Sequence, residues 1–252
     1  MIRRTSAQSD MDRAIEVLAG GFCFTRSFTH PYVPERIGAV WVLRDAPRKR
    51  GHYRNEEWIA HDVPPEEVDR IARTHTRGRF AVCAIHGIDE PDEPLRLGFK
   101  ALDYRLGTTE PLMIHRLRRI PRLDAPVAIE RVSTSEMADR LAKVARSRQI
   151  LPEHLGNGSP LRAYVALIDD EPVGWVRSVV VGDATWCSNM HVVPACRRRG
   201  IARALLCRML RDDRAGGAKS AVLLASHTGA RLYPVVGYEQ IGTLLLFTPR
   251  KR

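Results

Sequence analysis

The stretch that decides the fold is HVVPACRRRGIARALL, residues 191–206. An apolar strand pattern ends at Pro194, three arginines follow, and Gly200 opens an apolar helical segment. The first turn of a helix presents backbone N–H groups that lack helical partners, together with a partial positive charge. Gly200 leaves the backbone open to a ligand, and Arg203 adds positive charge one turn into the helix. The stretch therefore predicts a site for a diphosphate group. The alternative is an ordinary strand-to-helix turn with solvated arginines.

Two motifs on this background resemble the GNAT superfamily of N-acetyltransferases. Arg197-x-x-Gly200-x-Ala202 is similar to the family's Arg/Gln-x-x-Gly-x-Gly/Ala motif, and the preceding Val-x-Pro strand end fits as well. Residues 232–238, LYPVVGY, resemble the family's Leu-Tyr-x-x-x-Gly-Phe/Tyr segment, which also lies downstream. The resemblance covers residues 127–252, nearly a complete domain. It implies a mixed α/β sheet with the GNAT-like acyl-CoA N-acyltransferase fold.

The resemblance also implies a donor and its site. Acetyl-CoA is expected between two diverging parallel strands, here residues 185–193 and 221–225. The residues implied to bind it are Met190, His191, Val192, Arg198, Arg199, Gly200, Ile201, Ala202, Arg203 and Ser226. Ser226 stands where many members of the family carry Asn, which puts that contact in doubt. No metal is implied.

A direct attack of an amine on the thioester is the implied reaction. Tyr233 matches the family's tyrosine that protonates, or donates a hydrogen bond to, the departing sulfur; a phenol is protonated at neutral pH. The alternative for Tyr233 is a core aromatic. No Glu stands on either central strand, so the titratable candidates near the site are His191 and His227, with structural roles or water-mediated deprotonation as alternatives. Alternate residues of 186–189 are expected to line the acceptor pocket.

Strand and helix patterns alternate along the chain, which predicts a mixed sheet covered by helices on both faces. In the second half the expected strands are residues 127–129, 164–168, 173–181, 185–193, 221–224 and 238–247. The expected helices there begin at a capping box, residues 133–136, and cover residues 200–213 and 228–236. In the first half we expect helices at 11–18, 64–72 and 90–102 and strands at 39–43 and 80–85, with 117–126 as a linker.

The two halves share a weak repeat. Residues 97–104, LGFKALDY, align with residues 231–238 at an offset of 134, and residues 47–53 echo the arginine loop. In this alignment Phe99 replaces Tyr233 and Tyr53 replaces Ala202. We therefore expect two domains: residues 1–126, a truncated or degenerate GNAT-like copy without catalysis, and residues 127–252, the acetyltransferase. Chance similarity is the alternative.

Composition limits the function classes. The chain has 252 residues, 44% of them hydrophobic, and a net charge of +11, which suggests an anionic partner or only general solubility. Few aromatics interleave the basic residues, which argues against nucleic acid. Five cysteines without a CxxC pair argue against disulfides and structural zinc. Residues 1–4 turn polar at once, and no apolar run could span a membrane, so the expected location is cytoplasmic.

The leading function is transfer of an acetyl group from acetyl-CoA to a small-molecule or peptide amine. The alternative is a GNAT-fold module that binds acetyl-CoA without turnover. The sequence leaves the acceptor and the oligomeric state open.

Overall fold

A computed structural model describes residues 6–122 and 125–250, with side chains from residue 10 onward. The described chain divides into two compact units. Unit 1 comprises the described residues up to 113 together with 224–227 and 240–250, and unit 2 comprises residues 114–223 and 228–239. Compactness thus groups the chain differently from two successive domains cut near residue 126, because late segments of the chain belong to unit 1.

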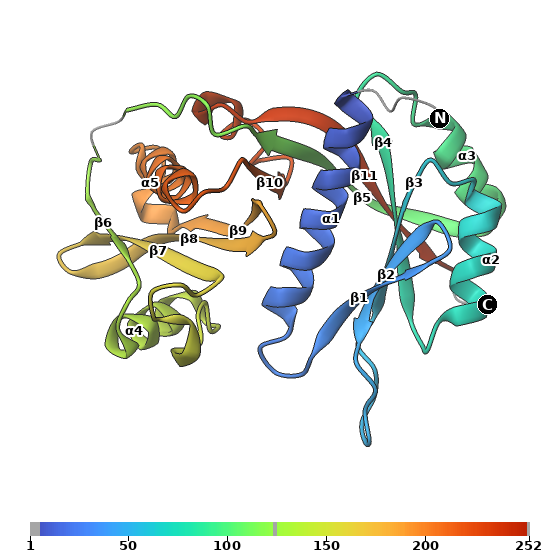
Figure 1. Cartoon of the computed structure of the whole chain (residues 1–252), viewed down its shortest axis with the longest axis horizontal. Coiled ribbons are helices and arrows are strands. Elements are labelled where there is room, and N and C mark those ends of the chain that lie inside the picture. Colours follow the sequence, from blue (N-terminus) through green and yellow to red (C-terminus); the bar gives the residue numbers. More distant parts are fainter. Residues whose placement is uncertain (1–5, 123–124, 251–252) are drawn as a thin grey trace. The chain divides into compact units, whose positions relative to one another are not determined.

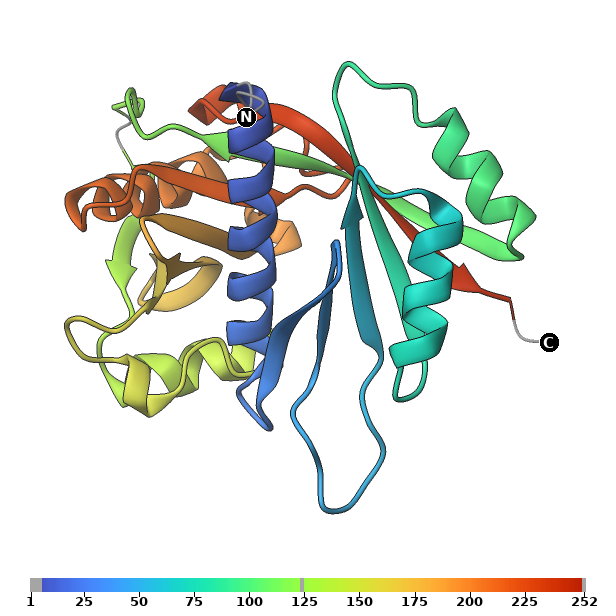
Figure 2. The same cartoon turned by 45° about the vertical axis from the view of Figure 1, so that its right-hand side comes forward.

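Unit 1 contains a mixed sheet. Its strands lie in the order β1-β2-β3-β4-β11-β5. Their bounds are β1 Tyr32–Ile37, β2 Val40–Asp45, β3 Glu56–His61, β4 Phe80–Gly87, β11 Glu239–Pro249 and β5 Tyr104–His115. Helix α1 (Ser6–Arg26) lies on one face, and α2 (Pro65–His75) and α3 (Glu93–Ala101) lie on the other (Figure 2). Strands β3 and β4 are parallel, with α2 as the crossover between them.

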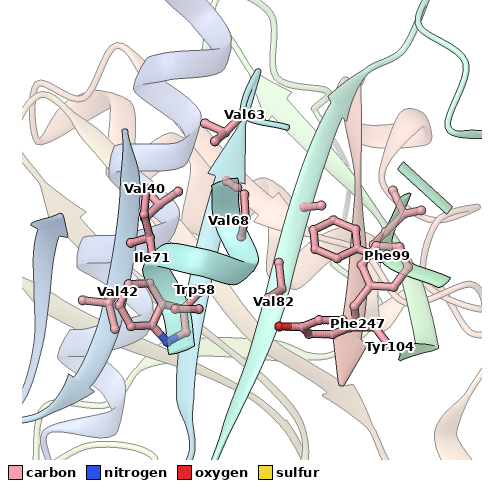
Figure 3. Close-up of a cluster of buried hydrophobic side chains, with 14 residues drawn as sticks. Val40, Val42, Trp58, Val63, Val68, Ile71, Val82, Phe99, Tyr104 and Phe247 are labelled. Atoms are coloured by element: carbon pink, nitrogen blue, oxygen red, sulfur yellow. The ribbon is translucent and has the colours of Figure 1, made fainter. Parts of the chain in front are cut away.

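The core of unit 1 lies between the sheet and α2 and α3. Figure 3 shows Val42 and Trp58 beneath α2, and Phe99 of α3 close to Phe247 of β11. The Phe99 and Phe247 rings stack with centroids 4.4 Å apart, and both side chains are fully or almost fully buried. The last strand of the chain is therefore part of the core of unit 1.

Unit 2 contains a second run of strands, in the order β10-β9-β8-β7-β6. Their bounds are β10 Ser220–Leu224, β9 Ala184–Val192, β8 Glu171–Val181, β7 Leu161–Ile168 and β6 Ala128–Arg131. Helices α4 (Ser135–Ala145) and α5 (Ile201–Ala215) lie on opposite sides of β7 to β9 (Figure 1). Only β9 and β10 are parallel among the described pairs of this unit.

Asp213 shows which face of this sheet meets α5. Its buried carboxylate accepts hydrogen bonds from Ser178 of β8 at 2.7 Å and Thr185 of β9 at 2.9 Å, and it pairs with Arg162 of β7 at 2.7 Å. Because side chains alternate along a strand, the odd-numbered residues of β8 face the other way, toward α4.

Several local expectations are wrong, each for a physical reason. The cap of α4 is Thr134, whose hydroxyl accepts from Met137 N at 3.3 Å, so the capping residue is one position later than Ser133. Residues 228–236 form turns and one short 3-10 helix, Pro234–Val236, because Pro234 and Gly237 interrupt a regular helix. Residues 47–53 connect the antiparallel strands β2 and β3 and precede no helix, so they do not correspond to the arginine loop.

Other features concern the whole described chain. All five cysteines are free thiols. Within residues 6–122 and 125–250, no helix is long and apolar enough to cross a membrane. Residues 1–4, whose basic and polar character entered the sequence argument, lie outside the described ranges, as do residues 123–124 of the expected linker.

Candidate functional site

Strands β9 and β10 separate partway along their length. They pair in parallel over only three positions, from Ser220 opposite Ala184 to Val222 opposite Trp186. Beyond Trp186, β9 continues for six residues without a partner on that side among the described strands, where its neighbours are β10 and β8. The diverging strands expected from the sequence are thus present. The backbone of Met190 to Val192 lies in the diverging part.

A bulge lies in the same part of β9. Trp175 of β8 pairs with His191, but Arg177 pairs with Ser188, so β9 contains one residue more than β8 between these two pairs. Asn189 takes up the extra length with φ +54°, and its side-chain amide donates to the side-chain oxygen of Gln149. A bulge locally redirects backbone groups and often lies beside an active site. Here it turns the backbone of Asn189 and Met190 out of regular pairing.

The arginine loop and the start of α5 form a cradle of backbone amides. Gly200 is the N-cap of α5 with φ +80°, and Arg198 also has a positive φ of 64°. The first hydrogen bond into the helix is from Ala204 N to Gly200 O at 3.1 Å. Among the described residues, none accepts a hydrogen bond from the six amides of residues 198–203. A Cβ at Gly200 would meet only Pro126, at 3.9 Å, so the space in front of this residue is open.

Positive charge surrounds the cradle. Arg198, Arg199 and Arg203 are exposed, whereas Ile201 is buried and anchors the helix start in the core. The guanidinium of Arg197 donates from Nε to Val192 O at 2.9 Å, which ties the loop back to the end of β9. Free amides, a helix N-terminus and several arginines suit an anion such as a diphosphate.

Tyr233 lies in the core of unit 2 with its side chain 8% exposed. Its ring meets that of Tyr238 edge-on, with centroids 5.6 Å apart. Burial raises the pKa of the Tyr233 phenol, and the nearby thiol of Cys187 on β9 adds to the rise. The phenol therefore keeps its proton at neutral pH and sits close to the strand that diverges from β10.

The other expected residues lie in different units: His191 in unit 2, and Ser226 and His227 in unit 1. His191 stacks on Trp175 with centroids 4.6 Å apart, and burial together with the charge of Arg197 lowers the pKa of its imidazole. Ser226 and His227 are exposed and belong to unit 1. There His227 Nε2 lies 3.3 Å from Thr109 Oγ1. Burial raises the pKa of Glu110, and the neighbouring His227 offsets part of this rise.

The corresponding place in unit 1 has different chemistry. Strands β3 and β4 pair without a break from Glu56 opposite Phe80 to His61 opposite Ile85, so they do not diverge. Helix α2 begins at Pro64 and Pro65, which have no N–H to donate, and its first turn carries the acidic side chains of Glu66 and Glu67. A small cavity of about 250 Å³ lies at this helix start and is lined in part by Asp62 and Glu90. None of this suits a phosphate.

Other polar residues near the diverging strands are not indicated by any sequence motif. Arg177 and Ser188 come together only through the register of β8 and β9, so a linear pattern does not show the pair. Ser188 was indicated only by the expectation that alternate residues of 186–189 line the acceptor pocket.

Comparisons with known proteins bear on the same region. Residues 159–240 match the family described as acetyltransferase (GNAT) domain. No curated protein matches the chain. Among solved structures, a GCN5-related N-acetyltransferase from Kribbella flavida is 16% identical with a TM-score of 0.68, over 95% of this chain and 96% of that one.

Two further solved structures also match over nearly the whole chain. A tandem GNAT protein from the clavulanic acid biosynthesis pathway is 13% identical with a TM-score of 0.54, over 97% of this chain and 96% of that one. A GCN5-related N-acetyltransferase-like protein from Streptococcus suis is 11% identical with a TM-score of 0.56, over 96% and 99%. At these identities the likeness shows the fold.

Proposed function

Because this chain contains a GNAT acetyltransferase domain at residues 159–240 and has the GNAT-type fold over nearly its whole length, we propose that it transfers an acetyl group from acetyl-CoA to a primary amine. The observation that carries the proposal is the combination, in unit 2, of diverging strands with a cradle of free amides. Acetyl-CoA suits the residues present, because its diphosphate needs donors and its thioester needs an open strand edge.

In this proposal residues 198–203 hold the diphosphate through their backbone N–H groups. The open φ +80° position of Gly200 lets the anion approach, and Arg198, Arg199 and Arg203 supply charge. The backbone of Met190, His191 and Val192 pairs with the pantetheine arm along the free edge of β9 and polarises the thioester carbonyl.

The residues around the thioester account for the protons. The amine nitrogen forms a bond to the acyl carbon while the carbon–sulfur bond breaks. One proton must leave the nitrogen and one must reach the sulfur. The Tyr233 phenol, which stays protonated, supplies the second. The neutral imidazole of His191 is the proposed acceptor of the first, and both residues return to their starting state by exchange with water.

Turnover with a panel of amines separates an enzyme from a module that only binds acetyl-CoA. Release of the CoA thiol is measured with the full chain, acetyl-CoA and each amine in turn. Amine-dependent release supports the enzyme. If acetyl-CoA raises the melting temperature but no amine promotes release, the binding module is the better description. The presence of Tyr233 at the family's tyrosine position favours the enzyme, because the proposed reaction needs a proton donor for the leaving sulfur.

We also propose that unit 1 is a degenerate copy that binds no CoA. The support is its unbroken β3–β4 pairing and its proline-led, acidic helix start. Calorimetric titration of the full chain with CoA then gives one site per chain. Two equivalent sites would disprove this part of the proposal and leave the acetyl transfer of unit 2 untouched.

A further inference from the structure

Three polar side chains share the face of unit 2 that is turned away from α5. Trp175 and Arg177 are two positions apart on β8, and Ser188 lies directly opposite Arg177 on β9. On the same two strands, Ser178 and Thr185 point to Asp213 of α5. Alternation therefore places Trp175, Arg177 and Ser188 on the opposite face, beside the bulge at Asn189.

All three side chains can donate hydrogen bonds, and two of them have no acceptor. The indole Nε1 of Trp175 and the hydroxyl of Ser188 are buried and have no hydrogen-bond partner among the described residues. Trp175 as a whole is 6% exposed. Buried polar atoms in native proteins nearly always have partners, so two such atoms on one face, a strand apart, indicate a place where a ligand supplies the acceptor.

Arg177 gives this face a positive charge. Its guanidinium is largely buried, and this burial lowers its pKa to about 10, so it is still charged at neutral pH. A guanidinium also recognises carboxylates through two parallel hydrogen bonds.

The position of this face relative to Tyr233 indicates that the acceptor amine binds there. Thr185 and Cys187 of β9 face α5, and Cys187 is the residue close to Tyr233, which the proposed function places at the leaving sulfur. The proton donor to the leaving sulfur occupies the α5 side of β9, which leaves the other side for the attacking amine. That side is the face with Ser188 and Arg177.

We propose that the acceptor amine carries a carboxylate, as an amino acid does, and that Arg177 and Ser188 bind this carboxylate beside the β9 bulge. The inference rests on the proposed acetyl transfer and names its substrate class.

The test compares matched amines. The full chain with acetyl-CoA is assayed against common amino acids and against their carboxamides, which keep the amine and lose only the negative charge. We expect kcat/KM to favour the carboxylate member of a pair by about tenfold or more. Arg177→Met, which keeps the buried length and removes the charge, should abolish most of this preference. Ser188→Ala should raise KM for the carboxylates without a loss of stability, since the hydroxyl has no partner to lose among the described residues.

Controls separate folding, donor binding and acceptor binding. Arg214→Met removes an exposed arginine from the last turn of α5 in the same unit and should change neither stability nor preference. The melting-temperature rise with CoA should be the same in wild type, Arg177→Met and Ser188→Ala. If Arg177→Met does not fold, the KM of Ser188→Ala for the carboxylate substrates tests the inference.

Binding without turnover is measured as well, by titrating the CoA-saturated protein with N-acetyl amino acids and with their carboxamides. Equal affinity for the two series, equal kcat/KM in wild type, or a preference that survives both substitutions would overturn the inference. Failure of the underlying proposal looks different: neither a CoA-dependent rise in melting temperature nor thiol release with any amine.

Discussion

Replacing Gly200 by Val tests the cradle most directly. Gly200 has φ +80°, a conformation that costs an L-residue about 1–2 kcal/mol. Its added side chain enters open space, because the nearest atom to a Cβ there is Pro126 Cγ at 3.9 Å. The substitution is therefore expected to weaken folding modestly and to collide mainly with whatever binds in front of the six free amides.

The expected loss of affinity follows from those amides. A hydrogen bond to a charged group contributes about 1.5–3 kcal/mol, so moving the diphosphate away from two of them weakens binding about 100-fold or more. At a CoA concentration about 100 times the wild-type Kd, binding stabilises the wild-type protein by about 2.7 kcal/mol. The same concentration stabilises Gly200→Val by only about 0.4 kcal/mol. For a chain of this size the difference is about 4–9 °C in the CoA-induced rise of the melting temperature.

Gly158→Val is the matched control, measured by thermal unfolding with and without CoA. Gly158 also lies in unit 2, has φ +86° and has no atom within 4 Å of the place that an added Cβ would take. Both variants should melt a few degrees below wild type without CoA, and only Gly158→Val should retain the full rise with CoA. A full rise in Gly200→Val, or an equal loss in both variants, would refute the placement of the diphosphate at residues 198–203.

The remaining predictions concern catalysis and folding in unit 2. Tyr233→Phe should lower kcat about tenfold or more, a barrier increase of roughly 1.4 kcal/mol, with unchanged CoA affinity. Tyr238→Phe removes the phenol of the neighbouring ring, which has no role in the proposed reaction, and should leave kcat alone; equal effects would contradict the role of Tyr233. A base must be unprotonated, and the pKa of His191 is lowered from 6.5. Loss of the His191 base should therefore reduce kcat/KM only as the pH drops below 6.5. If His191→Gln shows the same decrease of kcat/KM at low pH, the imidazole is not part of the mechanism. Thr134→Ala should destabilise unit 2 by about 1 kcal/mol in urea unfolding and Ser133→Ala by much less, and the reverse order would contradict the observed cap.

Sequence motifs predicted the turn and the helix start at residues 197–203, because this structure is local. The arginine loop, the glycine and the helix start are consecutive, and backbone amides depend on no particular side chain. The strand before the loop and the strand after α5 were also recognisable, since β9 and β10 carry apolar runs of the right length. Their family-implied divergence agrees with the three-position pairing.

The acceptor side could not be predicted in the same way. The position of Ser188 opposite Arg177 depends on the register of β8 and β9 and on the one-residue bulge at Asn189. A pattern of alternating residues shows which side chains share a face of one strand but not which residues lie opposite on the next. The arginine loop also misled the comparison of the two halves: the basic residues 47–53 resemble it in composition, whereas the matching topological position, after β3, is occupied by Pro64 and Pro65.

The place of β11 in unit 1 has a consequence for how the chain matures on the ribosome. β11 pairs with β4 from Gly242 opposite Gly87 to Phe247 opposite Val82, and Phe247 fills the core of the first unit. The part of unit 1 that precedes residue 114 therefore cannot reach its native state until residues 239–249 have been made, although domains usually fold in the order of their synthesis. A stop codon just before residue 240 would consequently damage residues that were translated much earlier, because it would leave β4 with an open, aggregation-prone edge.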